Sequence, residues 1–148
     1  MRFILVDSIV SLVAGERVVA LRHIAPDDDY FQDHFPGFPV VPGVLLTEMM
    51  AQASGKCLDA QRLPRGKAML ARILSASFRQ WVRPGDTVEL HGTIVANQDR
   101  FATAECEARV AGRVAAQARL FFAFMPQDQF APNHRDEVLE AYLAQHTA

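Results

Sequence analysis

One long helical stretch, set among segments that alternate with a period of two, is the feature that most restricts how this chain can fold. Pro36, Pro39 and Pro42 each fix φ and restrict the preceding residue, so residues 34–43 should form a stiff, extended loop. A proline suits the first turn of a helix, and the twenty residues after Pro42 carry apolar side chains at helical spacing. The first half of this helix is apolar on nearly all sides, so we expect that half to be buried.

Strand patterns begin before the helix. Residues 7–13 and 16–24 favour two strands joined by a tight turn at Ala14–Gly15, which predicts a hairpin. Pro26 and the three aspartates 27–29 then end the second strand. Aspartates at this place suit the N-cap of a short helical turn better than a metal site.

Four more strands are predicted after the helix. The first covers residues 67–82 and ends at the turn Pro84–Asp86, where the second begins. Residues 102–110 alternate small apolar with polar side chains, and after a turn at Ala111–Gly112 a last strand turns alternate residues from 114 to 124 inward. The buried side of residues 102–110 is mostly alanine, which would let another element pack close to the sheet.

The element order is therefore β-β-α-β-β-β-β, with short connections that favour antiparallel pairing over parallel crossovers. We expect an α+β fold in which a curved antiparallel β-sheet wraps a long central helix. A chain of 148 residues leaves no room for a second full domain, so we predict one domain over residues 1–125 and a C-terminal extension over residues 126–148. In the extension, Asn133 suits a helix cap, and an apolar stripe follows at Val138, Leu139, Tyr142 and Leu143.

Composition and charge exclude several classes of protein. Cys57 and Cys106 lie far apart and outside any C-x-x-C spacing, so neither a zinc site nor a redox pair is predicted, and a reducing, cytoplasmic setting is expected. Charged residues interrupt the apolar stretches 1–13 and 110–125, so we expect neither a signal peptide nor a membrane span. A net charge of −2 argues against a dedicated nucleic-acid-binding protein.

The charge is unevenly distributed along the chain. Residues 56–83 hold seven basic residues and one acidic residue, a net charge of +6, whereas the rest of the chain carries −8. This basic segment is either a solvated surface or a docking site for an acidic partner.

Two titratable residues flank the proline-rich loop. His34 begins it, and Glu48 lies in the most apolar part of the helix, where Thr47 and Gln52 offer only a narrow polar stripe. Burial raises the pKa of a carboxyl group, so Glu48 should stay protonated and act as an acid, while a neutral imidazole can act as a base. Such a pair suits elimination or hydration, in which one group removes a carbon-bound proton and the other protonates the departing hydroxyl. Gly43, at the helix N-terminus, offers a backbone N–H to a carbonyl oxygen that gains negative charge.

The run from His34 to Glu48 resembles the active-site signature of the β-hydroxyacyl-acyl-carrier-protein dehydratases of fatty acid synthesis, H-F-P-x-x-P-V-x-P-G followed by an acidic residue on the central helix. The spacing of 14 residues to Glu48 and of nine to Gly43 matches the signature. Further matches lie at Ala51–Gln52, Phe78–Arg79 and Pro84–Gly85–Asp86. The resemblance extends over residues 5–125.

The resemblance implies the hotdog fold, assembled as a homodimer or a trimer of dimers, with each active site shared between two subunits. His34 would remove the proton at C2 of a 3-hydroxyacyl thioester, Glu48 would protonate the leaving hydroxyl, and the Gly43 N–H would polarise the thioester carbonyl. The product would be a trans-2-enoyl thioester. The resemblance implies no metal or redox cofactor, because the phosphopantetheine arm belongs to the acyl carrier protein.

Further site residues follow from the same resemblance. We expect the substrate to contact Gly43 and its neighbours Phe35, Phe38, Val44 and Gln52. The acidic surface of the carrier protein would meet the basic segment, where the docking candidates are Lys67, Arg72, Arg79 and Arg83. Relatives that also isomerise the double bond usually carry aspartate at the position of Glu48, so glutamate there indicates dehydration alone.

Three departures from the family pattern leave open the acyl chain length and the choice between carrier protein and coenzyme A. Asp33 and Phe38 replace a usual glycine and a common polar residue beside the presumed site, and Ser75–Ala76 replaces an acidic–basic pair. They are compatible with a specialised pathway such as polyketide or aryl polyene synthesis. Two alternatives remain: a hotdog thioesterase that uses Glu48 to activate water, although such enzymes generally lack the histidine loop, and a non-catalytic acyl-thioester binding module.

Overall fold

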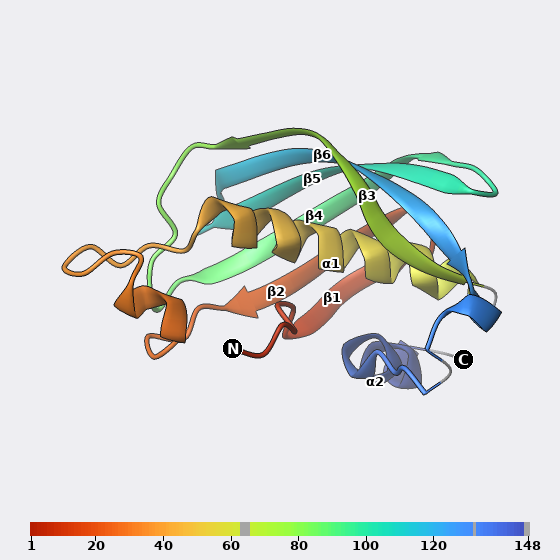
Figure 1. The fold of residues 1–148 in the computed structure, drawn as a ribbon, viewed down its shortest axis with the longest axis horizontal. Helices are drawn as coiled ribbons and strands as arrows, with labels where there is room; N and C mark the ends of the chain where they lie inside the picture. Colours follow the sequence, from red (N-terminus) through yellow and green to blue (C-terminus); the bar gives the residue numbers. More distant parts are fainter. Residues whose placement is uncertain (63–65, 132, 147–148) are drawn as a thin grey trace.

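The computed structural model describes residues 1–62, 66–131 and 133–146. Six strands form one antiparallel sheet in the order β1-β2-β4-β5-β6-β3. The strands are β1 (Ser8–Val13), β2 (Arg17–His23), β3 (Gly66–Phe78), β4 (Thr87–Asn97), β5 (Phe101–Val110) and β6 (Arg113–Pro126). The long helix α1 (Gly43–Arg62) lies across one face of the sheet, and the short helix α2 (Glu137–His146) contacts β1 (Figure 1). The predicted α+β architecture, a long helix wrapped by an antiparallel sheet, is confirmed.

The sheet departs from chain order where α1 crosses it. β2, which precedes α1, lies next to the edge strand β1. After α1 the chain re-enters the sheet as β3 at the opposite edge, where β3 pairs with β6. The strand predicted over residues 67–82 is shorter than expected. It is β3, which ends at Phe78, so residues 79–82 lie outside it. The register between β3 and β6 shifts at two places, and such β-bulges bend a strand. Residues 69–81 are all exposed.

Small side chains let α1 lie close to the middle of the sheet. β5 turns three alanines and Cys106 inward, and the Ser54 hydroxyl oxygen lies 3.1 Å from the Cys106 sulfur. A Cβ atom at Gly92 of β4 would come within 2.5 Å of that same hydroxyl oxygen, so this position requires glycine. The prediction that the alanine-rich face of residues 102–110 allows close packing is confirmed.

Burial along α1 confirms the prediction in part. Leu46, Met49 and Met50 of the apolar first half are buried as predicted, but Val44 is 76% exposed. Residues 53–59 of the second half are also all buried, Lys56 and Asp59 included. The second half is covered because Asp136 pairs with Lys56 and Lys67 of β3 pairs with Asp59. Lys56 and Asp59 can therefore be buried because each forms an ion pair with an oppositely charged side chain.

Two caps differ from the sequence prediction. Helix α2 begins at Glu137, and the residue before it, Asp136, caps it by accepting a 3.0 Å hydrogen bond from the Leu139 N–H, so the prediction of Asn133 as the cap is wrong. The predicted short turn after the aspartates is a 3-10 helix (Asp29–Gln32), but Asp28 does not cap it. Asp28 instead accepts a 3.0 Å hydrogen bond from the Tyr30 hydroxyl.

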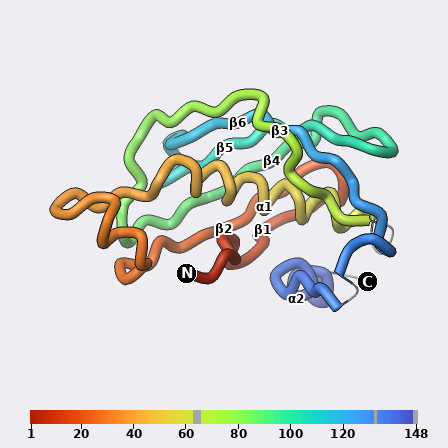
Figure 2. Tube along the Cα trace, viewed as in Figure 1, coloured from red at the N-terminus to blue at the C-terminus, as the bar shows by residue number. Residues whose placement is uncertain are grey.

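The N-terminal segment and helix α2 lie on the β1 side of the sheet (Figure 2). None of the described helices is long and apolar enough to cross a membrane. The Lys56–Asp136 ion pair, with 2.8 Å between nitrogen and oxygen, connects the C-terminal extension to α1. The division at residue 125 stays a prediction, and residues 147–148 of the extension lie outside the described residues.

Candidate active site

The ring of His34 is held from two sides. Its Nδ1 lies 3.0 Å from the carbonyl oxygen of Val40, and the ring stacks on Phe35 with 4.0 Å between centroids. A carbonyl oxygen only accepts, so the Nδ1 in this contact carries the proton, and the neutral ring keeps a lone pair on Nε2. The loop therefore presents His34 in the tautomer that a base at Nε2 requires.

An exposed aromatic and basic cluster lies beside the loop. The rings of Phe38 and Trp81 meet edge to face with 5.9 Å between centroids, and the Arg83 guanidinium carbon lies 5.3 Å from the Phe38 ring centre. Sequence reasoning favours a packing role for Trp81, near the end of the predicted strand 67–82, but this residue is 67% exposed.

Glu48 projects from the first half of α1 and is partly buried. Its Oε2 accepts a 3.4 Å hydrogen bond from Gln52 Nε2. Burial raises the pKa of the Glu48 carboxyl group, while the Gln52 hydrogen bond and the charge of Lys67 lower it by less. The predicted direction of this pKa shift is confirmed.

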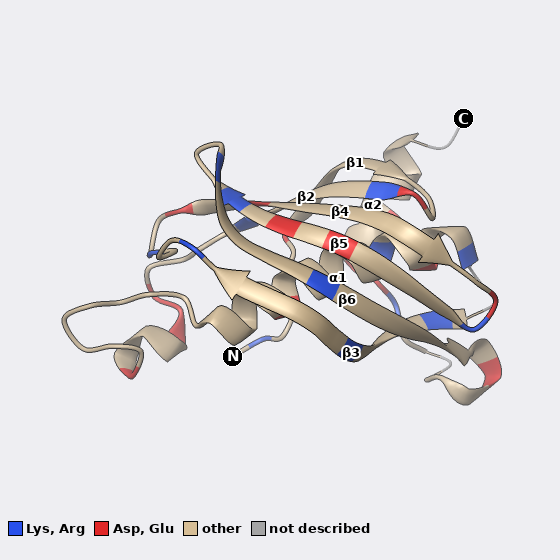
Figure 3. Ribbon diagram, turned by 90° about the horizontal axis from the view of Figure 1, so that it is seen from above, with Lys and Arg blue, Asp and Glu red and all other residues tan. Residues whose placement is uncertain are grey.

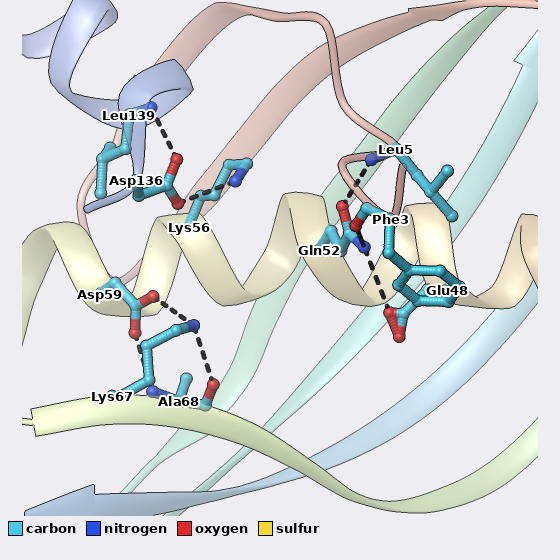
Figure 4. A network of polar contacts seen from close by, with 10 residues as sticks. All are labelled: Phe3, Leu5, Glu48, Gln52, Lys56, Asp59, Lys67, Ala68, Asp136 and Leu139. Carbon is cyan, nitrogen blue, oxygen red and sulfur yellow. Dashed lines mark hydrogen bonds and ion pairs between the residues drawn. The ribbon is translucent and has the colours of Figure 1, made fainter. Parts of the chain in front are cut away.

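Gln52 connects Glu48 to the N-terminal segment. Its Oε1 accepts a 2.8 Å hydrogen bond from the Leu5 N–H, and its Nε2 donates a 3.0 Å hydrogen bond to the Phe3 carbonyl oxygen. Figure 4 shows these contacts. One side chain thus contacts both the acid and the N-terminal segment.

Gly43 is the first residue of α1, so its N–H belongs to the turn whose donors lack partners within the helix. A Cβ atom at this position would lie 3.1 Å from the Phe78 ring, so a larger residue would press on the end of β3. The neighbouring Val44 and Phe35 are exposed, which leaves the helix N-terminus accessible.

A cavity of about 1040 Å³ opens along α1. Its lining includes Glu48, Gln52, Lys56, Lys67 and Asp136. His34 is not among the described residues that line it, and neither is Gly43. One copy of the chain therefore does not bring the predicted base and the predicted acid together in this cavity.

The basic segment is divided between internal contacts and the surface. Lys67 faces inward and its Nζ lies 2.7 Å from Asp59 Oδ2, and the Arg62 guanidinium carbon lies 3.5 Å above the Phe124 ring. Arg72, Arg79 and Arg83 are exposed. Arg65 lies outside the described residues. Elsewhere, the outer face of the sheet carries acidic residues on β5 next to a basic one on β6 (Figure 3).

Comparison with known proteins identifies sequence relatives. The FabA-like domain family matches residues 1–119. The chain is 41% identical over 117 residues to the 3-hydroxyacyl-[acyl-carrier-protein] dehydratase FabZ of Lactobacillus helveticus, covering 78% of this chain and 79% of the relative. It is also 41% identical over 121 residues to the FabZ dehydratase of Deinococcus radiodurans, covering 82% and 83%.

Solved structures show the same fold at low sequence identity. The fluoroacetyl-CoA thioesterase FlK matches with a TM-score of 0.68 and 15% identity, covering 93% of this chain and 99% of that chain. The smu.793 protein of Streptococcus mutans, solved with acetyl CoA, matches with a TM-score of 0.65 and 15% identity, covering 85% and 94%. These similarities confirm the predicted hotdog fold.

Proposed function

This chain belongs to the FabA-like domain family, and on that premise we propose that it removes water from 3-hydroxyacyl thioesters of acyl carrier protein in fatty acid synthesis. The observation that carries the proposal is Glu48, a partly buried carboxyl group with a raised pKa, placed 14 residues after a histidine whose Nδ1 contacts a backbone carbonyl oxygen and so leaves Nε2 to act as the base. Such an acid and such a base are the two groups that a dehydration needs.

The reaction proceeds by transfer of two protons. His34 Nε2 takes the proton from C2, the electrons of that C–H bond form the C2–C3 double bond, and the C3–O bond breaks. Glu48 donates its proton to the departing oxygen, which leaves as water. The N–H of Gly43 donates a hydrogen bond to the thioester oxygen while that oxygen gains charge. Proton return from His34 to Glu48 restores both groups.

We propose that the active site forms between two copies of the chain. The cavity holds Glu48 but not His34, which supports a base supplied by the second copy. β3 is an edge strand with exposed backbone groups and a row of exposed apolar side chains. These side chains are Met69, Leu70, Ile73, Leu74 and Phe78. Pairing of β3 with β3 of a second copy would cover them.

Substitution of Leu74 by glutamate should weaken this dimer by at least about 100-fold in Kd, because two like charges would face each other across the symmetry axis. Sedimentation velocity measures the dissociation. The control is Val10→Glu, which places the same charge on β1, the other edge strand, and should leave the dimer intact. A wild-type chain that sediments as a monomer would contradict the proposal.

The substitution Gln52→Met should move the alkaline limb of kcat/KM to higher pH. The Gln52 hydrogen bond lowers the pKa of Glu48, so its removal raises that pKa further. Glu48 must hold a proton to act as an acid, so a higher pKa extends the active range upward. The control is Thr47→Val, because Thr47 donates its hydrogen bond to the Gly43 carbonyl oxygen. A limb that moves to lower pH contradicts this role of Glu48.

The exposed Arg72, Arg79 and Arg83 are our proposed docking residues for the acidic carrier protein, whereas Lys67 is used in its internal ion pair. We place the reaction in the cytoplasm. Both cysteines are buried free thiols, which suits a reducing compartment.

A further inference from the structure

The cavity that holds Glu48 runs along one face of α1 to a polar wall, and its lining also includes residues 1–4 and the segment Asp27–Tyr30. Glu48, Gln52 and Lys56 are spaced four residues apart, so their side chains follow one face of the helix. Figure 4 shows Glu48 at one end of this row, Gln52 in the middle, and Lys56 with Asp136 at the other end. All four line the same cavity.

The wall consists of the Lys56–Asp136 ion pair with Lys67 beside it, and a second ion pair holds Lys67 to Asp59, which does not itself line the cavity. Lys56 Nζ lies 2.8 Å from Asp136 Oδ2, and these side chains are only 11% and 17% exposed. The other Asp136 oxygen accepts from the Leu139 N–H at 3.0 Å. Beside this pair, Asp59 accepts from Lys67 Nζ at 2.7 Å and from the Ala68 N–H at 2.8 Å. An alkyl chain pushed into this wall would separate charges that are largely shielded from water, which is strongly unfavourable.

The floor of the cavity between Glu48 and the wall is open. Ala51 and Gly55 line it, and a Cβ atom at Gly55 would have nothing within 4 Å. Glycine inside a helix is less favourable than alanine. Close packing does not explain Gly55, and the space above it lies between the acid and the wall.

The length of this space follows from the helix. Eight residues from Glu48 to Lys56 rise about 12 Å along the axis. An extended chain of roughly nine or ten carbon atoms covers that span, because each carbon–carbon bond of about 1.5 Å advances the chain by somewhat less than its length.

We propose that the cavity holds the acyl chain and that the Lys56–Asp136 pair ends it, so that the enzyme selects short- and medium-chain 3-hydroxyacyl thioesters. This proposal rests on the proposed function. It assigns a specificity role to a residue that immediately precedes α2, far in sequence from the acid and the base.

The test measures kcat/KM for 3-hydroxyacyl thioesters of acyl carrier protein with four, eight, twelve and sixteen carbons. The wild type should be at least about 10-fold better with four or eight carbons than with sixteen. Lys56→Ala combined with Asp136→Ser removes the wall while serine keeps a capping oxygen for α2. This double variant should raise the sixteen-to-four ratio by about 10-fold or more.

A second variant shifts the preference in the opposite direction. Gly55→Met fills the open floor and should lower the eight-to-four ratio by about 10-fold or more. If the double variant fails to fold, Gly55→Met alone still tests the proposal. The control is Glu105→Ser combined with Arg119→Ala, which removes an exposed ion pair of 3.6 Å between β5 and β6 and should leave the profile unchanged.

The outcomes separate the two proposals. A wild type that dehydrates substrates of all four lengths equally, or ratios that move in neither variant while turnover persists, overturn the role of the wall and leave the dehydratase reaction standing. A wild type that dehydrates none of the four substrates overturns the proposed function, and the chain-length role with it.

Discussion

Alanine at position 34 or glutamine at position 48 should each reduce kcat for dehydration by about 10²- to 10⁴-fold, the range expected when one general acid or base is removed. His34→Ala removes the group that takes the C2 proton. Glu48→Gln keeps the size of the side chain and its contact with Gln52, but an amide N–H is far too weak an acid to protonate the departing hydroxyl. The measurement follows enoyl absorbance and free thiol together, with circular dichroism to show that each variant is folded.

Mixing the two inactive variants tests whether subunits share the site. A heterodimer of His34→Ala with Glu48→Gln contains one site with both groups intact and one site with neither. Random exchange of subunits should therefore restore about a quarter of the wild-type activity if each site takes its two groups from different chains. The matched control mixes His34→Ala with the double variant that carries both substitutions, which regenerates no intact site.

The same assay distinguishes the alternative functions. Release of free thiol without enoyl product would assign the chain to the thioesterases. Binding of an acyl thioester with neither product would assign it to the non-catalytic binding modules. Full activity in both single variants would contradict the acid–base roles of His34 and Glu48.

The substitution Lys67→Met should lower the free energy of unfolding by about 3 to 5 kcal/mol, because it leaves the Asp59 carboxylate buried without its cation. The side chain of Asp59 is only 4% exposed, and Lys67 Nζ lies 2.7 Å from its Oδ2. Urea unfolding at neutral pH measures the loss. The control, Arg119→Met, breaks the exposed pair with Glu105 and should change stability by about 1 kcal/mol or less.

The deficit of Lys67→Met should shrink as the pH falls. Burial raises the pKa of Asp59 in the folded state, while Lys67 lowers it, so removal of Lys67 raises this pKa further. A group whose folded-state pKa lies above its unfolded value binds a proton more readily in the folded state, so it loses stability as pH rises between the two values. Comparison of the variant with the wild type at mildly acidic and mildly alkaline pH checks the sign. Equal deficits at both pH values would exclude Asp59 as the cause.

Local sequence patterns predicted most of the fold. The period-2 alternation in residues 102–110, the turn at Ala111–Gly112 and the helix after Pro42 all appear as expected, because each depends on residues close together in the chain. The raised pKa of Glu48 was predictable for the same reason, since its apolar neighbours on the helix exclude water.

Contacts between distant segments could not be predicted in this way. The pairing of β3 with β6 depends on where α1 returns the chain to the sheet. The pair of Lys56 with Asp136 joins residues 80 positions apart, so neither the burial of Lys56 nor the capping role of Asp136 left a periodic signal. Sequence reasoning missed Asp59 and Asp136 as partners in shielded ion pairs, because a charged residue is ordinarily expected at the surface.

Because α1 packs closely against the alanines of β5, the positions along β5 should differ in how well they tolerate substitution. A larger side chain at Ala104 or Ala108 would be overpacked, at a typical cost of 1–3 kcal/mol, and would lift the helix that carries Glu48. The outward neighbours, such as Glu105, face solvent and can change freely. Tolerance to substitution should therefore alternate from residue to residue along β5. Selection for a reaction at Glu48 should also restrict the size of the inward side chains of β5, although none of them takes part in the reaction.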